Sequence, residues 1–458
     1  MVNISIIGAG SVAFSTNFIR DLCVTESLWD STITLMDVSK ERLSMVHNLA
    51  VRYAKETGAE LKIKSTVNRK EALEDADFVI CTVKTGGYQP MEAEREIAER
   101  YGYYRGIGDR VCDYYGGIGA YYQLKFFLDL ARDMEDLCPD AWLIETANPV
   151  FEGTTLIARE TKINIVGVCH GHLGYQKIAE TLGLNLEDVH VEIAGFNHCV
   201  WMLSFLYKGE NAYPLLDEWI EKESERYWKS KEFLEGLPWE TEQMSPAAVD
   251  MYRQYCLFPI GDTVRSVSPW WYHVDLETKK RWFGPTGGFD SEIGWSIYLR
   301  RREERLKRMQ RLYEDSSASL TEEFPPTASG EQHIPLIDSI VNDKEMILQL
   351  NIPNRGAVSG IPEDVVVEIP VVVSGRGVRR IHVGALPKRL MMYVIIPRML
   401  RMERILQAFN EGDRKSLVLM LMDDHRTKSY EKAKALIDEL LAQPWNAEAA
   451  RHYQWRIP

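Results

Sequence analysis

Residues 2–13 read VNISIIGAGSVA, and this stretch decides the fold. The apolar run up to Gly8 predicts a short buried strand, and the apolar positions after Ser11 predict a helix. Gly8 permits a tight turn, Gly10 lets the backbone approach a pyrophosphate, and Ala13 lets the helix pack close to the strand. Phosphates would bind the N–H groups at the helix N-terminus. The spacing predicts a dinucleotide site, although a glycine-rich turn that binds nothing remains an alternative.

An acidic residue ends the next predicted strand. Residues 31–37 read STITLMD, and Asp37 lies 27 residues after Gly10. A carboxylate there accepts hydrogen bonds from ribose hydroxyls and repels a 2′-phosphate, which favours NAD over NADP. Ser39 is a plausible N-cap for a helix over residues 40–57, so a capping role for Asp37 is the alternative.

Strands alternate with helices over roughly the first 170 residues. This alternation predicts a Rossmann-type, doubly wound parallel sheet of the kind found in lactate and malate dehydrogenases. Predicted strands cover residues 2–7, 31–37, 61–65, 77–83, 141–146 and 163–168, with a helix at 120–137 among those between them.

Beyond residue 170 the pattern becomes α+β. Longer strands are predicted at 189–196 and 199–207, a strand pair at 364–383, and helices near 213–228, 245–256, 286–313 and 388–455. We therefore expect an NAD-binding domain over 1–196 and an α+β substrate-binding, catalytic and oligomerisation domain over 197–458.

Charge and cysteine usage exclude several classes of protein. The 458 residues include 54 Lys and Arg against 67 Asp and Glu, a formal charge of −13. That balance argues against nucleic-acid binding, which needs a basic surface. The seven cysteines are scattered without a C-x-x-C pair, which favours a reduced protein. No export signal or membrane-length apolar segment is visible, so we expect a cytoplasmic protein without a membrane partner.

Polar residues follow several predicted strands. Asn148 comes just after the strand at 141–146, where ligands bind in such sheets, although Asn-Pro is also a common turn dipeptide. Cys169 and His170 end the next strand, and His198 follows another. A thiolate and an imidazole could converge on a divalent metal if water or substrate completed the shell. A buried cysteine and a satisfied core histidine are the alternative.

Asp262 and Arg265 form the last candidate pair, in the stretch PIGDTVR at 259–265. A loop carboxylate beside an arginine is suited to act as a base with a tuned pKa. A helix cap or a plain salt bridge would use the same residues.

Taken together, these motifs resemble glycoside hydrolase family 4, closest to its α-glucosidase-like members from thermophilic bacteria. The resemblance runs from residue 3 to about 453. It rests on GAGS (8–11), TLMD (34–37), GYYRGI (102–107), ANPVFEGTT (147–155), CHGH (169–172), AGFNH (194–198), MSPAAVDMY (244–252), PIGDTVR (259–265) and SGEQHIP (329–335).

The resemblance implies redox-assisted hydrolysis, an exception to two-carboxylate glycosidase chemistry. NAD⁺ accepts hydride from C3 of the sugar, a base removes the acidified C2 proton, and the C1–O bond breaks by elimination. Water then adds and the hydride returns. A divalent metal, usually Mn²⁺, chelates the C2 and C3 oxygens as a Lewis acid.

The resemblance also implies roles for individual residues. Cys169 and His198 match the metal ligands, and Asp262 matches the catalytic base. His170 matches a residue that assists the leaving group, Asn148 matches a sugar-binding residue, and Arg265 would hold Asp262 ionised or contact the sugar. The cofactor residues are Gly8, Gly10, Ser11, Ala13 and Asp37.

The expected substrate is an unphosphorylated α-glycoside, because His170 stands where six-phosphosugar members tend to have Asp or Asn. An α-glucoside is favoured, with α-galactosides and α-uronides as alternatives. The loop at 106–119 departs from the nearest relatives, and Asp109 and Arg110 within it are candidates for sugar contacts without an assigned role. The family suggests a homodimer or homotetramer. A net NAD-dependent dehydrogenase and a catalytically silent NAD-binding regulator are the alternatives from other classes.

Overall fold

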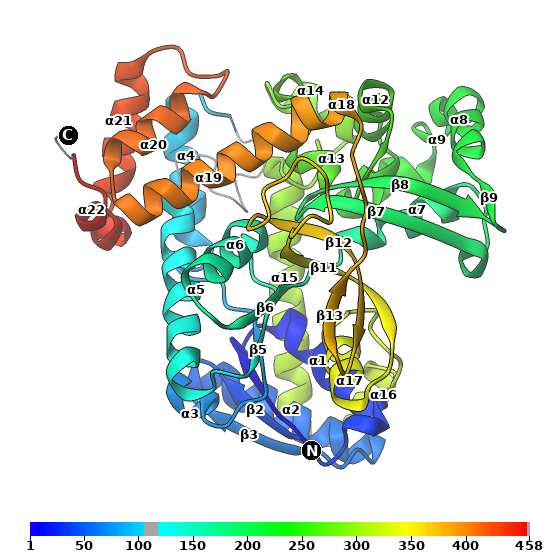
Figure 1. Ribbon diagram of the computed structural model, residues 1–458, viewed down its shortest axis with the longest axis vertical. Helices are drawn as coiled ribbons and strands as arrows, with labels where there is room; N and C mark the ends of the chain where they lie inside the picture. Colours follow the sequence, from blue (N-terminus) through cyan, green and yellow to red (C-terminus); the bar gives the residue numbers. More distant parts are fainter. Residues whose placement is uncertain (105–117, 456–458) are drawn as a thin grey trace.

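A single mixed sheet runs through the protein (Figure 1). The computed structural model describes residues 1–104 and 118–455, without the side chains of residues 12–15 and 119. Within these residues the sheet has 13 strands, in the order β10-β8-β7-β12-β11-β6-β5-β4-β1-β2-β3, with β13 paired to β12 and β9 to β8.

The first half of the chain forms the parallel part of the sheet. Strands β3-β2-β1-β4-β5-β6 pair in parallel, which is the strand order of a dinucleotide-binding Rossmann fold. The elements are β1 (Asn3–Ile7), α1 (Val12–Val24), β2 (Thr32–Met36), α2 (Lys40–Thr57), β3 (Lys62–Thr66), α3 (Arg69–Leu73), β4 (Phe78–Cys81), α4 (Gln89–Arg100), α5 (Ile118–Leu137), β5 (Trp142–Glu145), α6 (Val150–Glu160), β6 (Asn164–Gly167) and α7 (Gly174–Thr181).

The second half adds antiparallel strands to the edge of β6. Its strands are β7 (Val189–Phe196), β8 (Cys199–Tyr207), β9 (Glu210–Asn211), β10 (Phe258–Ile260), β11 (Met346–Pro353), β12 (Val366–Ser374) and β13 (Gly377–Arg380). Figure 1 shows the β7–β8 hairpin extending away from the Rossmann half. The long strands predicted at 189–196 and 199–207 and the strand pair within 364–383 are confirmed.

Helices cover this second half. They are α8 (Tyr213–Lys222), α9 (Ser224–Tyr227), α10 (Lys231–Glu235), α11 (Pro238–Thr241), α12 (Pro246–Tyr255), α13 (Thr263–Ser266), α14 (Leu276–Phe283), α15 (Glu292–Glu314), α16 (Leu320–Glu323), α17 (His333–Asn342), α18 (Lys388–Leu390), a π-turn (Met391–Ile395), α19 (Ile396–Glu411), α20 (Arg414–Met422), α21 (Tyr430–Leu441) and α22 (Ala447–His452). Among the described elements, α21 packs beside α4, where Arg100 and Tyr101 both contact Glu439 (Figure 1).

One predicted helix begins later than expected. The sequence predicts a helix from residue 286, whereas α15 starts at Glu292. Gly287 and Gly288 have φ values of +73° and +80°, a left-handed conformation that a helix cannot contain. Ser291 then caps the helix by accepting a hydrogen bond from the Gly294 N–H at 2.9 Å.

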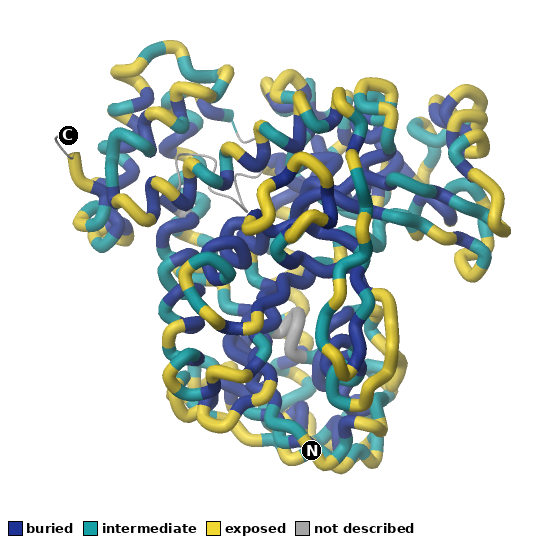
Figure 2. Tube along the Cα trace, viewed as in Figure 1, coloured by how far each residue is buried: buried dark blue, intermediate teal, exposed yellow. Residues whose placement is uncertain are grey.

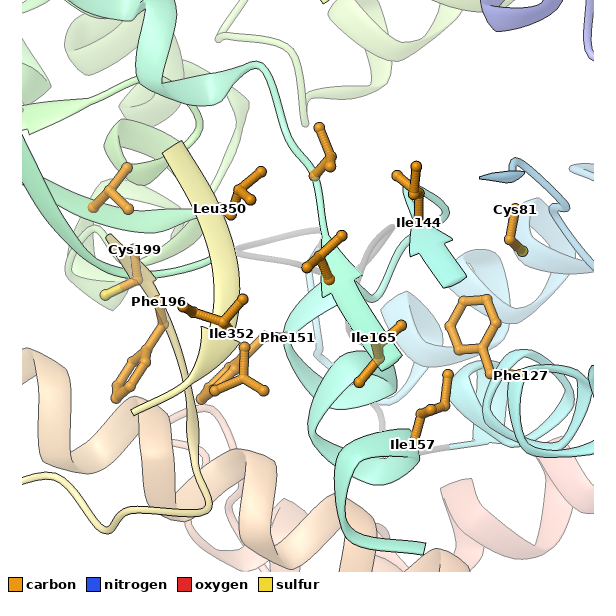
Figure 3. Packing of buried hydrophobic residues seen from close by; sticks show 14 of the residues in the cluster. Cys81, Phe127, Ile144, Phe151, Ile157, Ile165, Phe196, Cys199, Leu350 and Ile352 are labelled. Carbon is orange, nitrogen blue, oxygen red and sulfur yellow. The ribbon is translucent and has the colours of Figure 1, made fainter. Parts of the chain in front are cut away.

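The hydrophobic core is continuous across the two halves (Figure 2). Figure 3 shows side chains of the Rossmann strands and helices next to those of the later strands. Phe151 of α6 stacks on Phe196 of β7 with ring centroids 4.5 Å apart. The hydrophobic core and the sheet therefore both continue across the domain boundary predicted at residue 196. The division into two domains stays a prediction. Within the described residues, every helix is too short or too polar to cross a membrane.

Candidate active site

The glycine turn lies between β1 and α1, at the carboxyl edge of the parallel strands. Gly8 has a φ of +91°, and a Cβ added there would stand 2.9 Å from side-chain atoms of Thr82 and Val83. Only glycine suits that position. Ser11 directly precedes α1, whose exposed N–H groups can bind an anion, and Ala13 lies in its first turn with a side chain outside the described part.

Asp37 lies against this turn, as its position after β2 predicts. Its Oδ2 accepts a hydrogen bond from the Gly10 N–H at 2.9 Å, and its Oδ1 accepts one from the Ser39 N–H at 2.8 Å. Ser39 itself caps α2 through its hydroxyl. The structure thus brings the predicted acidic residue and the glycine turn together, in the place where a ribose would lie beside a pyrophosphate.

Cys169 and Asp262 are brought together by two glycine turns. A Cβ on Gly261 would lie 2.1 Å from the carbonyl oxygen of Gly171, so the two turns pack backbone against backbone. The Gly171 N–H donates to Cys169 Sγ at 3.4 Å. Residues separated by about ninety positions in the chain therefore meet above the sheet edge.

His198 joins them from the two-residue turn of the β7–β8 hairpin. Its φ is +57°, an uncommon value for a residue with a Cβ, and such strain is often found at functional sites. Its Nε2 lies 2.9 Å from Asp262 Oδ2. The geometry places the predicted metal ligand next to the predicted base.

Arg265 fixes the other oxygen of Asp262. Its Nη2 lies 2.6 Å from Asp262 Oδ1, Nη1 lies 3.0 Å from Glu242 Oε2, and Nε lies 3.5 Å from Asp290 Oδ2. Its guanidinium carbon also lies 4.6 Å from the centre of the Phe289 ring. Burial lowers the pKa of Arg265, but Asp262, Glu242 and Asp290 outweigh it and raise the pKa overall.

Glu242 and Asp290 were missed by sequence reasoning. Glu242 is fully enclosed, and its Oε1 accepts a hydrogen bond from the Phe289 backbone N–H. Neither carboxylate stands in a motif with a chemical signature, so only the fold reveals that they share Arg265. Their effect is to hold the arginine rigidly beside Asp262.

His170 is exposed and points its Nδ1 toward Glu331, 3.4 Å away. The hydrogen bond to Glu331 raises the pKa of His170. Glu331 comes from the SGEQHIP stretch before α17, far away in the chain. Asn148 is exposed between β5 and α6, at the strand end next to the one that carries Cys169. Asp109 and Arg110 lie outside the described residues.

The donor chemistry of this site suits a divalent metal only in part. Cys169 and His198 offer sulfur and nitrogen, and His198 Nδ1 is buried without a hydrogen-bond partner. Burial, followed by the charges of Glu368 and Asp262, raises the pKa of the Cys169 thiol, so a thiolate there needs a nearby cation. Among the described residues there is no cluster of three or more His, Cys, Asp or Glu side chains placed to hold a metal. Water or substrate oxygens would have to complete the coordination shell.

His333 gives a prediction about acid stability. It is buried at the start of α17, its Nε2 contacts Thr146 Oγ1, and burial lowers its pKa from 6.5 to about 4. Between pH 6.5 and 4 the unfolded chain gains a proton that the folded chain does not. Stability should therefore fall as the pH falls through this window, by about 2 kcal/mol from this residue between pH 7 and 5. In thermal unfolding, His333→Gln should lose less stability on acidification than the wild type does.

The exposed His190 on β7 offers a matched control. His190→Gln should leave the pH dependence of unfolding as it is in the wild type. If His333→Gln and the wild type lose the same stability between pH 7 and 5, the buried neutral imidazole does not cause the acid sensitivity.

The strand order and the glycine turn define a dinucleotide-binding fold, and solved structures with the same architecture include lactate dehydrogenase from Eimeria maxima (TM-score 0.51, 13% identity, covering 90% of this chain and 96% of that one). The family model for family 4 glycosyl hydrolases matches residues 3–184, and the model for the C-terminal domain of this family matches residues 193–427. The chain belongs to family 4 of the glycosyl hydrolases, as its motifs indicate.

Individual relatives differ in the sugar that they act on. The chain is 28% identical over 402 residues to an α-galactosidase of Bacillus subtilis (85% of each chain) and 26% identical over 466 residues to an α-galacturonidase of Thermoanaerobacterium saccharolyticum (96% and 95%). Its fold is similar to a 6-phospho-α-glucosidase from gut microorganisms solved with NAD and Mn²⁺ (TM-score 0.76, 16% identity, covering 96% of this chain and 97% of that one).

Proposed function

We propose that this protein hydrolyses α-glycosidic bonds, with α-glucosides as its first candidate substrates, using NAD⁺ and a divalent metal such as Mn²⁺. The observation that carries the proposal is the meeting of Cys169, His198 and Asp262 at one edge of the sheet. Structures of the same fold that were crystallised with NAD and Mn²⁺ support the choice of cofactors.

Two groups of residues would hold the cofactors. Gly8, Gly10, Ser11 and Asp37 surround the place of a dinucleotide, with Ala13 in the helix that follows. When bound, the nicotinamide supplies a reversible hydride acceptor for C3 of the sugar. Cys169 and His198 would hold the metal, which supplies Lewis acidity at the sugar oxygens.

The chain's own residues would move the protons. Asp262 is the proposed base for the C2 proton; Arg265 fixes its Oδ1, and its Oδ2 lies beside His198 Nε2. His170, held by Glu331, would assist the leaving group from the exposed side. Asn148 is proposed to hydrogen-bond the sugar. A direct contact of Arg265 with the sugar is less favoured, because three carboxylates already surround its guanidinium.

This charge arrangement favours a neutral sugar over a uronide. A sugar carboxylate next to Asp262 would need a cation to pair with, and Arg265, the arginine beside Asp262 in the described part of the chain, already pairs with Asp262, Glu242 and Asp290. An α-galacturonide nevertheless stays an alternative substrate, as does an α-galactoside, because both activities occur among the relatives.

The test is a panel of aryl α-glucosides, α-galactosides and α-galacturonides, each assayed with NAD⁺, Mn²⁺ and a thiol reductant. Hydrolysis should require both cofactors, and deuterium from the solvent should enter C2 of the released sugar. Full activity of chelated, NAD-free enzyme on any of these substrates would refute the proposal.

The same assay separates hydrolysis from the alternative of a net dehydrogenase. A hydrolase of the proposed kind returns the hydride, so absorbance of NADH should not accumulate with turnover. Accumulation of NADH in step with product would favour the dehydrogenase. We further expect a cytoplasmic enzyme, because the metal-binding thiol needs a reducing compartment, and a homodimer or homotetramer, which size-exclusion chromatography with light scattering would determine.

A further inference from the structure

The strands that precede Cys169 and His198 are not neighbours in the sheet. Strands β11 and β12 lie between β6 and β7, so the two strand ends are three strand spacings apart, roughly 14 Å at ~4.8 Å per spacing. One line of paired residues crosses this gap. It consists of Gly167, Asn351, Glu368 and Gly195, and we call it the cross-strand row.

The middle of the cross-strand row is polar and buried. Asn351 and Glu368 are 0% and 1% exposed, in strands that are otherwise mostly apolar. Asn351 Nδ2 donates to the Gly167 carbonyl at 3.4 Å, and Asn351 is paired in register with Glu368 on the neighbouring strand. Burying two polar side chains costs stability unless hydrogen bonds compensate for the lost contacts with water.

Asn197 connects this pair to the site. It lies two residues beyond Gly195, is 2% exposed, and its Nδ2 donates to Glu368 Oε2 at 3.2 Å. Asn197 directly precedes the candidate metal ligand His198 in the two-residue turn between β7 and β8, and Cys169 lies two residues beyond Gly167 at the other end of the cross-strand row. A continuous path therefore runs from Glu368 through Asn197 to the turn that carries His198.

We propose that Glu368 is a positioning residue for the metal ligand His198, and that it acts through the side-chain amide of Asn197. Glu368 offers two acceptor oxygens and so fixes which way the Asn197 amide points, whereas a glutamine could accept or donate there. With this amide fixed, the two-residue turn holds His198 at its φ of +57°. This inference rests on the proposed function, because it assumes that a metal binds at Cys169 and His198.

The test measures metal affinity by spectroscopy. Co²⁺ bound by a thiolate gives a sulfur-to-metal charge-transfer band, which Cys169→Ser should abolish. Because residues that support a ligand typically change metal affinity 10- to 100-fold, Glu368→Gln should weaken Co²⁺ binding by this factor, while the band returns at saturating metal and the affinity for NAD⁺ stays unchanged. Unchanged Co²⁺ affinity in Glu368→Gln would overturn the inference.

A second variant keeps the test decisive if Glu368→Gln fails to fold. Asn197→Ser removes the amide but keeps the carboxylate, and it should weaken Co²⁺ binding by a similar factor. Where both fold, the double variant should bind Co²⁺ no more weakly than the worse single variant, because both changes act on one path. Fully multiplicative effects, or unchanged affinity in Asn197→Ser, would contradict it.

Glu145→Gln is the matched control. Glu145 is also fully buried at a strand end, in β5, where its Oε1 accepts from the Ala147 N–H at 2.7 Å. This variant should leave Co²⁺ affinity unchanged. If the wild type shows no thiolate band, the proposed metal site is refuted. If the wild type shows the band and Glu368→Gln binds Co²⁺ as tightly, only the proposed role of Glu368 is refuted.

Discussion

Replacing Asp262 with asparagine should lower kcat by roughly 10²–10⁴-fold, the usual contribution of a positioned general base. Asparagine keeps the size and can still accept a hydrogen bond, but it cannot take the C2 proton. Exchange of the C2 hydrogen with deuterated solvent should fall by the same factor as hydrolysis. NAD⁺ affinity should be unchanged, because the proposed phosphate and ribose contacts at Gly10 and Asp37 follow β1 and β2, whereas Asp262 packs against the turn after β6.

Asp290→Asn is the comparison that separates the base from a simple ion-pair partner. The Oδ2 of Asp290 also lies near Arg265, 3.5 Å from its Nε, whereas the carboxylate beside His198 is that of Asp262. We expect kcat of this variant to fall less than about tenfold. Equal losses for Asp262→Asn and Asp290→Asn would show that Asp262 acts only by balancing the charge of Arg265.

Replacing Gly10 with alanine should abolish NAD⁺ binding at ordinary concentrations. The added Cβ would stand 2.6 Å from Asp37 Oδ2 and 2.8 Å from its Cγ, so the carboxylate must leave the place where it would meet the ribose. A displacement of about 1 Å in a positioned group can cost about 10²-fold, and we expect at least that loss in affinity by isothermal titration calorimetry.

Gly58→Ala is the control for the effect of a methyl group on glycine. Gly58 ends α2 with a φ of +76° and has open space around its missing side chain. Alanine there should cost about 1 kcal/mol of stability through its strained backbone and leave NAD⁺ affinity unchanged. Retained NAD⁺ affinity in Gly10→Ala would mean that the dinucleotide binds elsewhere.

The Rossmann half was predictable because its signals are local. Each parallel strand is a short apolar run, and Gly8 and Asp37 stand at strand ends whose position follows from strand order. The predicted helix over 40–57 is confirmed with its Ser39 cap. Strand β11 was missed because MILQLNIP carries the polar residues Gln349 and Asn351 at positions that the fold buries, where apolar residues are expected.

The active site was predictable only as a set of candidates. The positions of Cys169 and His198 just after predicted strands indicate a place for ligands. The sequence around these two residues does not indicate that β11 and β12, over 140 residues later in the chain, lie between β6 and β7. Glu242, Asp290 and Glu368 carry no motif, and each matters through a contact made by the fold. A buried contact between residues that are far apart in the chain leaves no periodic pattern in the sequence.

The antiparallel pairing of β11 with β6, at Asn351 and Gly167, also bears on how the chain can be produced in pieces. A fragment ending at residue 196 would contain β6 but not β11, leaving the backbone groups of β6 without a neighbour on that side. Such an uncovered edge invites pairing with another copy of itself. We therefore expect a recombinant fragment of the nucleotide-binding half to be insoluble when it is expressed alone. Supplying residues 346–374, as a separate peptide or by fusion, should keep it in solution.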